Sequence, residues 1–399
     1  MKNGWQCKKV SEIAKHSLGK MLDKAKNKGE PKPYLRNLNV RWFDFDLSDV
    51  LEMRFLPEEA AKYTAVKGDV LICEGGYPGR AAIWEQDEPI YFQKALHRVR
   101  FHEAERNKWF LYYLQAKDFD GTLKNHFNGA GIQHFTGEAL AEFVVPLPPL
   151  PEQRRIVGIL DEAFDGIATV KANAEKNLQN ARALFESHLQ SVFTQRGEGW
   201  VDKKLGEICE RITKGSSPKW QGIAYVERPG ILFVTSENVG EYAILLEQPK
   251  YVDEKFNAKD KKSILKRGDV LTNIVGASIG RTAVFDRDDV ANINQAVCLI
   301  RCEPDRLNNF FLTYLLNSPV FKQVLHENEV DNARANLSLG FFSQLLVPTP
   351  SLSRQRDIVA KLDALREETQ RLESIYQQKL AALDELKKSL LYQAFTGQL

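Results

Sequence analysis

The chain contains two copies of one sequence pattern, and this internal repeat constrains the fold more than any other feature. Residues 5–13 match 200–208, and residues 146–157 match 348–359. The offset between matched residues drifts from 195 to 202 over the first two-thirds of each copy and then stays at 202. Because loops absorb insertions and helices do not, the repeat predicts a variable globular domain followed by a long helix of constant length, twice over. The expected boundaries are 1–148, 149–197, 198–350 and 351–399.

The composition fits a cytoplasmic protein with hydrophobic cores. Of the 399 residues, 43% are hydrophobic, enough for two or three domains. The net charge is only +2, so any nucleic-acid-binding surface must be local. No apolar run approaches the ~20 residues of a membrane span, and the first residues lack a signal-peptide core, so no membrane partner is expected. The five cysteines form no C-x-x-C pair, which favours reduced thiols over a zinc site.

The two globular domains are expected to be mixed α/β (α+β). Short alternating runs at 69–73, 96–101 and 297–301 predict strands. The segments 107–116 and 307–317 predict helices.

Each copy ends in a predicted long helix. After Pro151, which suits a first helical turn, apolar residues recur at alternating spacings of four and three and slip once at Leu178; the second copy slips at the equivalent Leu380. About 42 residues make a helix of roughly 63 Å that cannot bury its apolar stripe alone. We expect an antiparallel coiled coil between the copies, with the domains at opposite ends in a pseudo-two-fold arrangement. The alternative is two unrelated helices that pack on separate domains. The predicted seam residues are Ile156, Leu160, Ile167, Val170, Leu178, Phe185, Ile358, Leu362, Leu365, Leu372, Tyr376, Leu380 and Leu383.

Basic, amide-rich and hydroxyl-rich loops lie at matching places in the two copies. Residues 1–36 carry ten lysines and arginines against three acids, and 211–220 is the corresponding segment. Lys and Arg neutralise phosphates, and Arg and Asn read base edges. A solvated lysine face and plain tight turns at the glycines are the alternatives. The predicted DNA contacts are Lys20, Lys24, Lys26, Lys28, Tyr34, Arg36, Asn37, Asn39, Arg41, Trp42, Gly76, Arg80, Lys214, Ser216, Ser217, Lys219, Ser236, Asn238, Asn273, Ser278 and Arg281.

No catalytic or cofactor motif is recognised in the sequence. The nearest approach to an adenine methyltransferase motif is Asn317-Ser-Pro-Val320, with Ser and Val where Pro and an aromatic are needed. There is no HExxH, GxSxG or Walker A pattern. Two alternatives to a DNA-recognition protein stay open: a self-sufficient DNA methyltransferase or nuclease with a divergent motif, and a coiled-coil scaffold whose ends bind proteins.

Several strings resemble the specificity subunits of type I restriction–modification systems. These are the helix entries Pro146-Leu-Pro-Pro-Leu-Pro-Glu-Gln-Arg-Arg-Ile-Val157 and, more loosely, 348–359, together with the tail 389–399 and the segments 34–42 and 68–80. The resemblance implies two target-recognition domains that each read one half of a bipartite DNA site, and helices that fix the gap. It also implies two methyltransferase subunits, which bind S-adenosylmethionine, and restriction subunits that use ATP and Mg²⁺. This chain itself would hold no cofactor and catalyse nothing.

Overall fold

The computed structural model describes residues 4–23, 25, 27–227, 230–329 and 335–399, and every structural statement here concerns those residues. The chain divides into two compact units, which are described one at a time. The first combines Met1–Glu175 with Gln378–Leu399, and the second is Lys176–Gln377. The predicted Lys24 and Lys26 lie outside the described residues.

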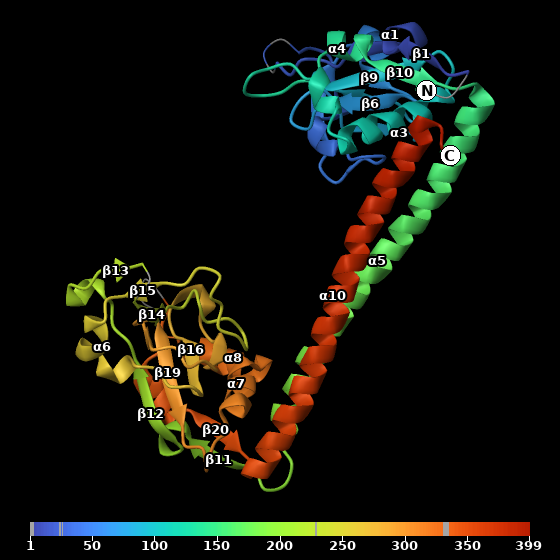
Figure 1. Ribbon diagram of the computed structural model, residues 1–399. Coiled ribbons are helices and arrows are strands. Elements are labelled where there is room, and N and C mark those ends of the chain that lie inside the picture. The colour runs from blue at the N-terminus through green and yellow to red at the C-terminus, as the bar shows by residue number, and fades with distance from the viewer. Residues whose placement is uncertain (1–3, 24, 26, 228–229, 330–334) are drawn as a thin grey trace. The chain divides into compact units, whose positions relative to one another are not determined.

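Two four-stranded sheets and one strand pair build the first unit (Figure 1). The first sheet is antiparallel, in the order β2 (Ala14–Leu18), β9 (Leu96–Phe101), β6 (Val70–Cys73) and β7 (Ala81–Ile83). The second runs β4 (Leu51–Phe55), β3 (Glu30–Leu35), β8 (Ile90–Phe92) and β5 (Thr64–Ala65), with β3 and β8 parallel. Strand β1 (Gln6–Lys9) pairs with β10 (Val144–Leu147). The helices are α1 (Val10–Ile13), α2 (Ala60–Tyr63), α3 (Arg106–Phe119) and α4 (Gly137–Glu142).

The second unit repeats this plan. Its first sheet runs β12 (Cys209–Lys214), β19 (Val297–Cys302), β16 (Asp269–Asn273) and β17 (Thr282–Phe285). The second runs β13 (Tyr225–Val226), β15 (Tyr251–Val252), β14 (Ile231–Val234) and β18 (Ala291–Ile293), with β14 and β18 parallel. Strand β11 (Val201–Lys204) pairs with β20 (Leu346–Thr349). The helices are α6 (Lys255–Lys259), α7 (Asn309–Asn317), α8 (Pro319–Glu327) and α9 (Leu339–Gln344). The mixed α/β tandem repeat is therefore confirmed, and the run at 297–301 is a strand as predicted.

The two long helices are present and equal in length. Helix α5 spans Leu150–Thr194 and α10 spans Leu352–Thr396, 45 residues each. In the first unit Lys171 Nζ lies 2.9 Å from Asp384 Oδ1, and in the second Arg182 Nε lies 3.1 Å from Glu373 Oε1. Numbers rise along α5 as they fall along α10, so within each unit the helices run antiparallel, as Figure 1 shows. The predicted antiparallel pairing is confirmed, and all thirteen predicted seam residues are buried or half-buried.

The helix ends belong to the domain cores. In the first unit Ile156 and Leu160 of α5 and Leu391 of α10 pack in one cluster with Trp109 of α3. In the second, Phe193 of α5 and Leu362 of α10 share the equivalent cluster. The contacts group each end of the helix pair with the domain on which it packs. Among the described residues, no helix is both long and apolar enough to cross a bilayer.

Candidate nucleic-acid interface

Three loops of the first unit gather at one end of its sheets. Strands β2 and β6 both pair with β9, where Leu18 lies opposite His97 and Cys73 opposite Leu96. The loop after β2 and the turn after β6 therefore leave the sheet at the same end. The turn after β3 joins them, because the Asn37 side chain donates a hydrogen bond to the Gly75 carbonyl at 3.0 Å.

The second unit gathers the equivalent loops in the same way. Lys214 at the end of β12 lies opposite Cys298, and Asn273 at the end of β16 lies opposite Val297. The Asn273 side chain donates to the Ser236 carbonyl at 2.9 Å, which ties the turn after β16 to the turn after β14. The predicted contacts of this unit thus lie on these loops or at the strand ends that lead into them: Lys214, Ser216, Ser217, Lys219, Ser236, Asn238, Asn273, Ser278 and Arg281.

Close backbone approaches fix these loops in place. A Cβ on Gly19 would lie 2.2 Å from the Gln93 carbonyl oxygen, and one on Gly215 would lie 1.7 Å from that of Ile293. Gly76 has φ +77°, and its Cβ would meet Asn37 Nδ2 at 2.2 Å. These glycines are therefore required by the fold, and Gly76 shapes the turn by admitting the Asn37 amide.

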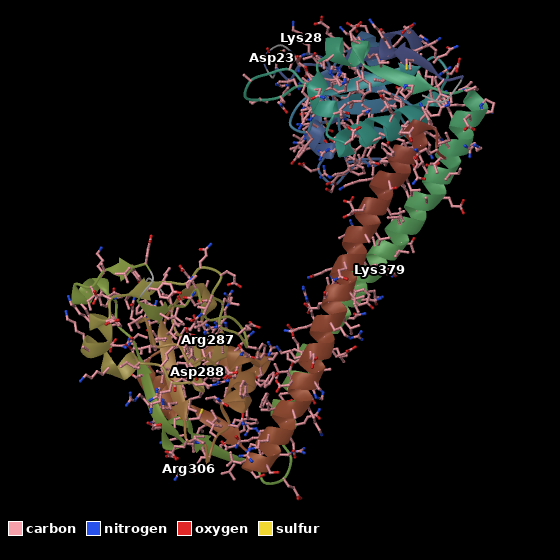
Figure 2. All side chains as sticks on the ribbon, viewed as in Figure 1. Asp23, Lys28, Arg287, Asp288, Arg306 and Lys379 are labelled. Atoms are coloured by element: carbon pink, nitrogen blue, oxygen red, sulfur yellow. The ribbon has the colours of Figure 1, made fainter. Side chains whose placement is uncertain are left out.

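Exposed cations stand on the same loops. Lys214, Lys219 and Arg281 are exposed, and within the described part of the chain none of them forms an ion pair. Lys28, labelled in Figure 2, is also exposed on the loop after β2. The Arg80 guanidinium lies 3.9 Å from the centre of the Tyr77 ring and donates to the Asn37 carbonyl at 3.0 Å. In each unit, exposed cations on these loops are suited to phosphate contacts, and the planar Arg80 guanidinium of the first unit is suited to base contacts as well.

Two further predicted arginines are already paired. Arg36 bonds Asp49 at 2.7 Å with a side chain that is only 15% exposed, and Arg41 bonds Asp46 at 3.1 Å. Trp42 is half-buried against the core of the first unit, and its side chain forms a hydrogen bond with Asp118. Burial raises the pKa of the Asp118 carboxyl group, although this hydrogen bond acts in the opposite direction. These three side chains stabilise the turn after β3 through contacts within the first unit.

Asn39 and Asn238, two further residues of the predicted interface, are buried. Asn39 Oδ1 accepts the backbone N–H of Arg36, and Asn238 Oδ1 accepts that of Thr235. Each amide group then donates to the carbonyl seven residues on, Asp46 or Leu245. The hydrogen bonds of each asparagine side chain close the equivalent turn of its own unit, so neither amide group is free to bind a base.

Three more residues of the predicted interface are also buried. Lys20 is 7% exposed and pairs with Glu59, while Tyr34 packs with the core residue Phe55. Asn273 is fully buried, although its Oδ1 has no partner among the described atoms. Burial removes these side chains from a rigid surface that DNA could touch. Ser216 bonds Asp260, Ser278 accepts from Asn273, and Ser217 and Ser236 are half-buried.

An aromatic turn recurs beside the interface and was not predicted. Phe43 and Tyr242 both have φ of +66°, rare for aromatic residues. Their rings pack on Tyr112 at 4.8 Å and on Tyr314 at 5.2 Å between centres. Those tyrosine hydroxyls donate to Asp161 of α5 and Asp363 of α10. Burial, and then these hydrogen bonds, raise the pKa of both tyrosines. The turn after β3 or β14 is thereby tied to a long helix in each unit.

Trp220 is another residue that the prediction omitted. It is 80% exposed on the loop after β12, next to Lys219. The adjacent lysine in the sequence was the signal that could have identified it.

The buried polar groups at the interface are structural. Burial raises the pKa of the Cys73 thiol to about 11, which keeps it neutral and poorly nucleophilic. Among the described residues, no group of three or more His, Cys, Asp or Glu side chains is placed to hold a metal ion. What the loops offer is a surface of hydrogen-bonding and cationic groups.

Comparison with known proteins places this architecture. The protein-family model of the type I restriction modification DNA specificity domain matches residues 2–179 and 197–381 of this sequence, so the chain belongs to that family. Within it, the chain is a type I restriction–modification specificity subunit, as the sequence resemblance implied. It is 25% identical over 340 residues to the type I restriction enzyme EcoBI specificity subunit of Escherichia coli, covering 80% of this chain and 71% of that subunit.

Solved structures share the fold over the whole chain. One is a chain from a study of complex assembly and conformational transition of the type I R-M system, with a TM-score of 0.80, 21% identity and coverage of 100% and 99%. Another is the HsdS subunit from Thermoanaerobacter tengcongensis, with a TM-score of 0.65, 21% identity and coverage of 100% and 98%.

Proposed function

We propose that this chain supplies the DNA sequence specificity of a type I restriction–modification complex, with each domain reading one half of a bipartite site. The loops after β2, β3 and β6, and those after β12, β14 and β16, form the two reading surfaces. Phosphate contacts from cations such as Lys214 and Arg281 hold the duplex, and hydrogen bonds to base edges select the sequence.

One observation carries this proposal: the two domains share loop scaffolds that hold different side chains. Asn37 and Ser236 occupy equivalent positions, as do Tyr77 and Ser278. The aromatic turn and the closely packed glycine after β2 or β12 meanwhile recur in both units. Because the loop backbones are alike and their side chains differ, the two domains are expected to recognise two different half-sites rather than the two halves of a palindrome.

We further propose that the long helices set the gap between half-sites and dock two methyltransferase subunits, through which the restriction subunits join. A cavity of about 790 Å³ in the first unit lies beside Tyr392 of α10, which is 65% exposed. Val144 of β10 and Leu346 of β20, at equivalent positions, are 44% and 54% exposed. Apolar groups exposed at matching places in both units support two equivalent partner sites. S-adenosylmethionine, ATP and Mg²⁺ would then be bound by the partners.

The test exchanges one domain. Replacing residues 1–145 with the equivalent segment of another family member, in a complex with methyltransferase subunits, is expected to change one half of the methylated sequence and leave the other half intact. Single-molecule sequencing of methylated genomic DNA reads both halves. A change in both halves would contradict the modular reading. The chain incubated alone with DNA, Mg²⁺ and S-adenosylmethionine serves as the control, and methylation there would favour a self-sufficient enzyme.

A further inference from the structure

An exposed tryptophan stands on the loop after β12 of the second unit. Trp220 lies in a 3-10 turn, Lys219–Gln221, and is 80% exposed. Indoles are among the largest apolar side chains, and they are normally covered by protein. A tryptophan left in water by the folded chain therefore indicates a surface that something else covers.

Hydrogen bonds and close packing hold this loop firmly. Gly215 packs against the Ile293 carbonyl, and its N–H donates to the Asn294 carbonyl at 3.2 Å. Gln221 Nε2 donates to Ser216 Oγ at 2.8 Å, and Ser216 in turn bonds the buried Asp260. The exposure of Trp220 is thus built into the loop and does not result from a frayed segment.

Exposed lysines lie on the Trp220 loop and on the segment beside it. Lys214 and Lys219 are exposed on the same loop, and Lys259 Nζ donates to the carbonyl of Gln221, the next residue, at 2.9 Å. Asp260, bonded to Ser216, brings the segment 253–262 alongside, with further exposed lysines at 255, 261 and 262. The loop and this segment together carry six lysines and three acidic residues, and one of the acidic residues, Asp260, is buried.

The first unit has the same combination at the equivalent loop. After Gly19, which is packed as closely as Gly215, Met21 is 58% exposed and Leu22 is 50% exposed. Lys28 follows on the same loop and is exposed as well. Apolar side chains with exposed lysines after the packed glycine are thus a repeated feature of the module.

We infer that Trp220 and its lysines, here called the Trp220 surface, form a DNA contact of the second domain beside its sequence-reading turns. The lysines neutralise phosphates, and the indole packs on sugar and base edges at the wall of the groove. Net positive charge matches the duplex, and the loop leaves the sheet at the same end as the turn that carries Arg281. This inference rests on the proposed function.

The test compares variants of the full-length chain for binding to a labelled 40-base-pair duplex that carries the methylated sequence found by mapping. Trp220→Ala is expected to weaken binding about tenfold without changing the salt dependence, because it removes an uncharged contact. Lys219→Gln is expected to lower the slope of log K against log salt by about one. Trp220→Phe should retain most of the affinity.

Val290→Ala is the matched control. Val290 is 59% exposed at the opposite end of β18, next to the acidic loop of Arg287 and Asp288 (Figure 2), and should not alter binding. If the unsubstituted chain binds the duplex and Trp220→Ala binds equally well, the Trp220 surface is not a DNA contact. Loss of binding to a methyltransferase subunit with DNA affinity unchanged would make it a protein-docking surface instead. If the unsubstituted chain does not prefer its mapped sequence, the proposed function itself fails.

Discussion

At the scale of single residues, His97 gives the first unit a dependence on pH. It is 1% exposed, and its Nε2 lies 2.9 Å from the Phe135 carbonyl oxygen. Burial lowers the pKa of His97 from 6.5 to about 4. Between those values the unfolded chain takes up a proton that the folded chain refuses, so stability is full above pH 6.5 and falls as the pH drops toward 4.

Lowering the pH from 7.5 to 5.0 should therefore cost the first unit about 2 kcal/mol of free energy of unfolding, at about 1.4 kcal/mol per pH unit. His97→Gln, which keeps a donor for the Phe135 carbonyl, should remove this loss. Hydrogen exchange of peptides from β9, corrected for intrinsic rates, measures it. Strand β19 is an internal control, because Cys298 occupies the equivalent position. A loss that persists in His97→Gln would rule out His97 as its source.

Residue identity predicted which loops lie together better than it predicted which of their side chains are exposed. The runs around Lys214, Lys219 and Arg281 lead to loops at one end of the domain, as expected from their composition. Asn39 and Asn238 were also selected, because an amide that can read adenine can equally close a turn on backbone groups. Sequence alone cannot separate these two uses, since they differ only in where the side chain points.

At the scale of elements, a buried glutamine anchors the start of each long helix with different strength. Gln153 donates to the Pro148 carbonyl at 2.7 Å, but its Oε1 has no partner among the described atoms. Gln355 donates to the carbonyls of Pro350 and Arg306, and it also accepts the N–H of Asn308 at 2.8 Å. Removing Gln355 would therefore leave more buried groups unpaired.

Gln355→Leu should cost about 2–3 kcal/mol of local stability, and Gln153→Leu about 1 kcal/mol, because each buried unpaired group is penalised. Hydrogen exchange in the first turns of α10 and α5 compares the two. Each variant is the control for the other, since the substitution and the helix position are the same. A larger loss for Gln153→Leu would reverse the expected order and contradict this account.

Helices were predicted correctly where the repeat of apolar residues extends over many turns. The predicted start of the first long helix, Pro151, is one residue from the observed start of α5 at Leu150. Helix α8 was not predicted, although Ser318 caps it and Pro319 begins it. Its nine residues are too few for an apolar repeat to stand out.

At the scale of the whole molecule, the paired helices should act as a ruler. Inserting one helical heptad into α5 after Glu175 and another into α10 after Gln377 keeps the seam in phase. It adds roughly 10 Å to the helix pair, which corresponds to about three base pairs of duplex. The unspecified gap in the methylated sequence should grow by that amount, with both half-sites unchanged.

The same insertion in α5 alone is the control, because it shifts the pairing register that Lys171 and Asp384 define in the first unit. That variant should lose methylation rather than widen the gap. An unchanged gap in the double insertion would show that the helices do not set the spacing.

The architecture could be predicted because the sequence contains the same pattern twice. A constant offset of 202 over both helix segments predicted partners of equal length, and the coincident slips at Leu178 and Leu380 favoured pairing. The sharing of each domain core with the ends of both helices was not predicted, because it depends on side-chain packing such as that of Trp109 with Phe395.

The aromatic turns at Phe43 and Tyr242 bear on the thermodynamics of recognition. Holding a non-glycine residue at φ of +66° costs of order 1–3 kcal/mol, and the tilted ring contact and the tyrosine–aspartate hydrogen bond offset this cost within the folded domain. The ordering entropy of the turn is thus lost during folding rather than on association with DNA. Preorganisation of this kind leaves more of the interaction free energy for discriminating one base pair from another.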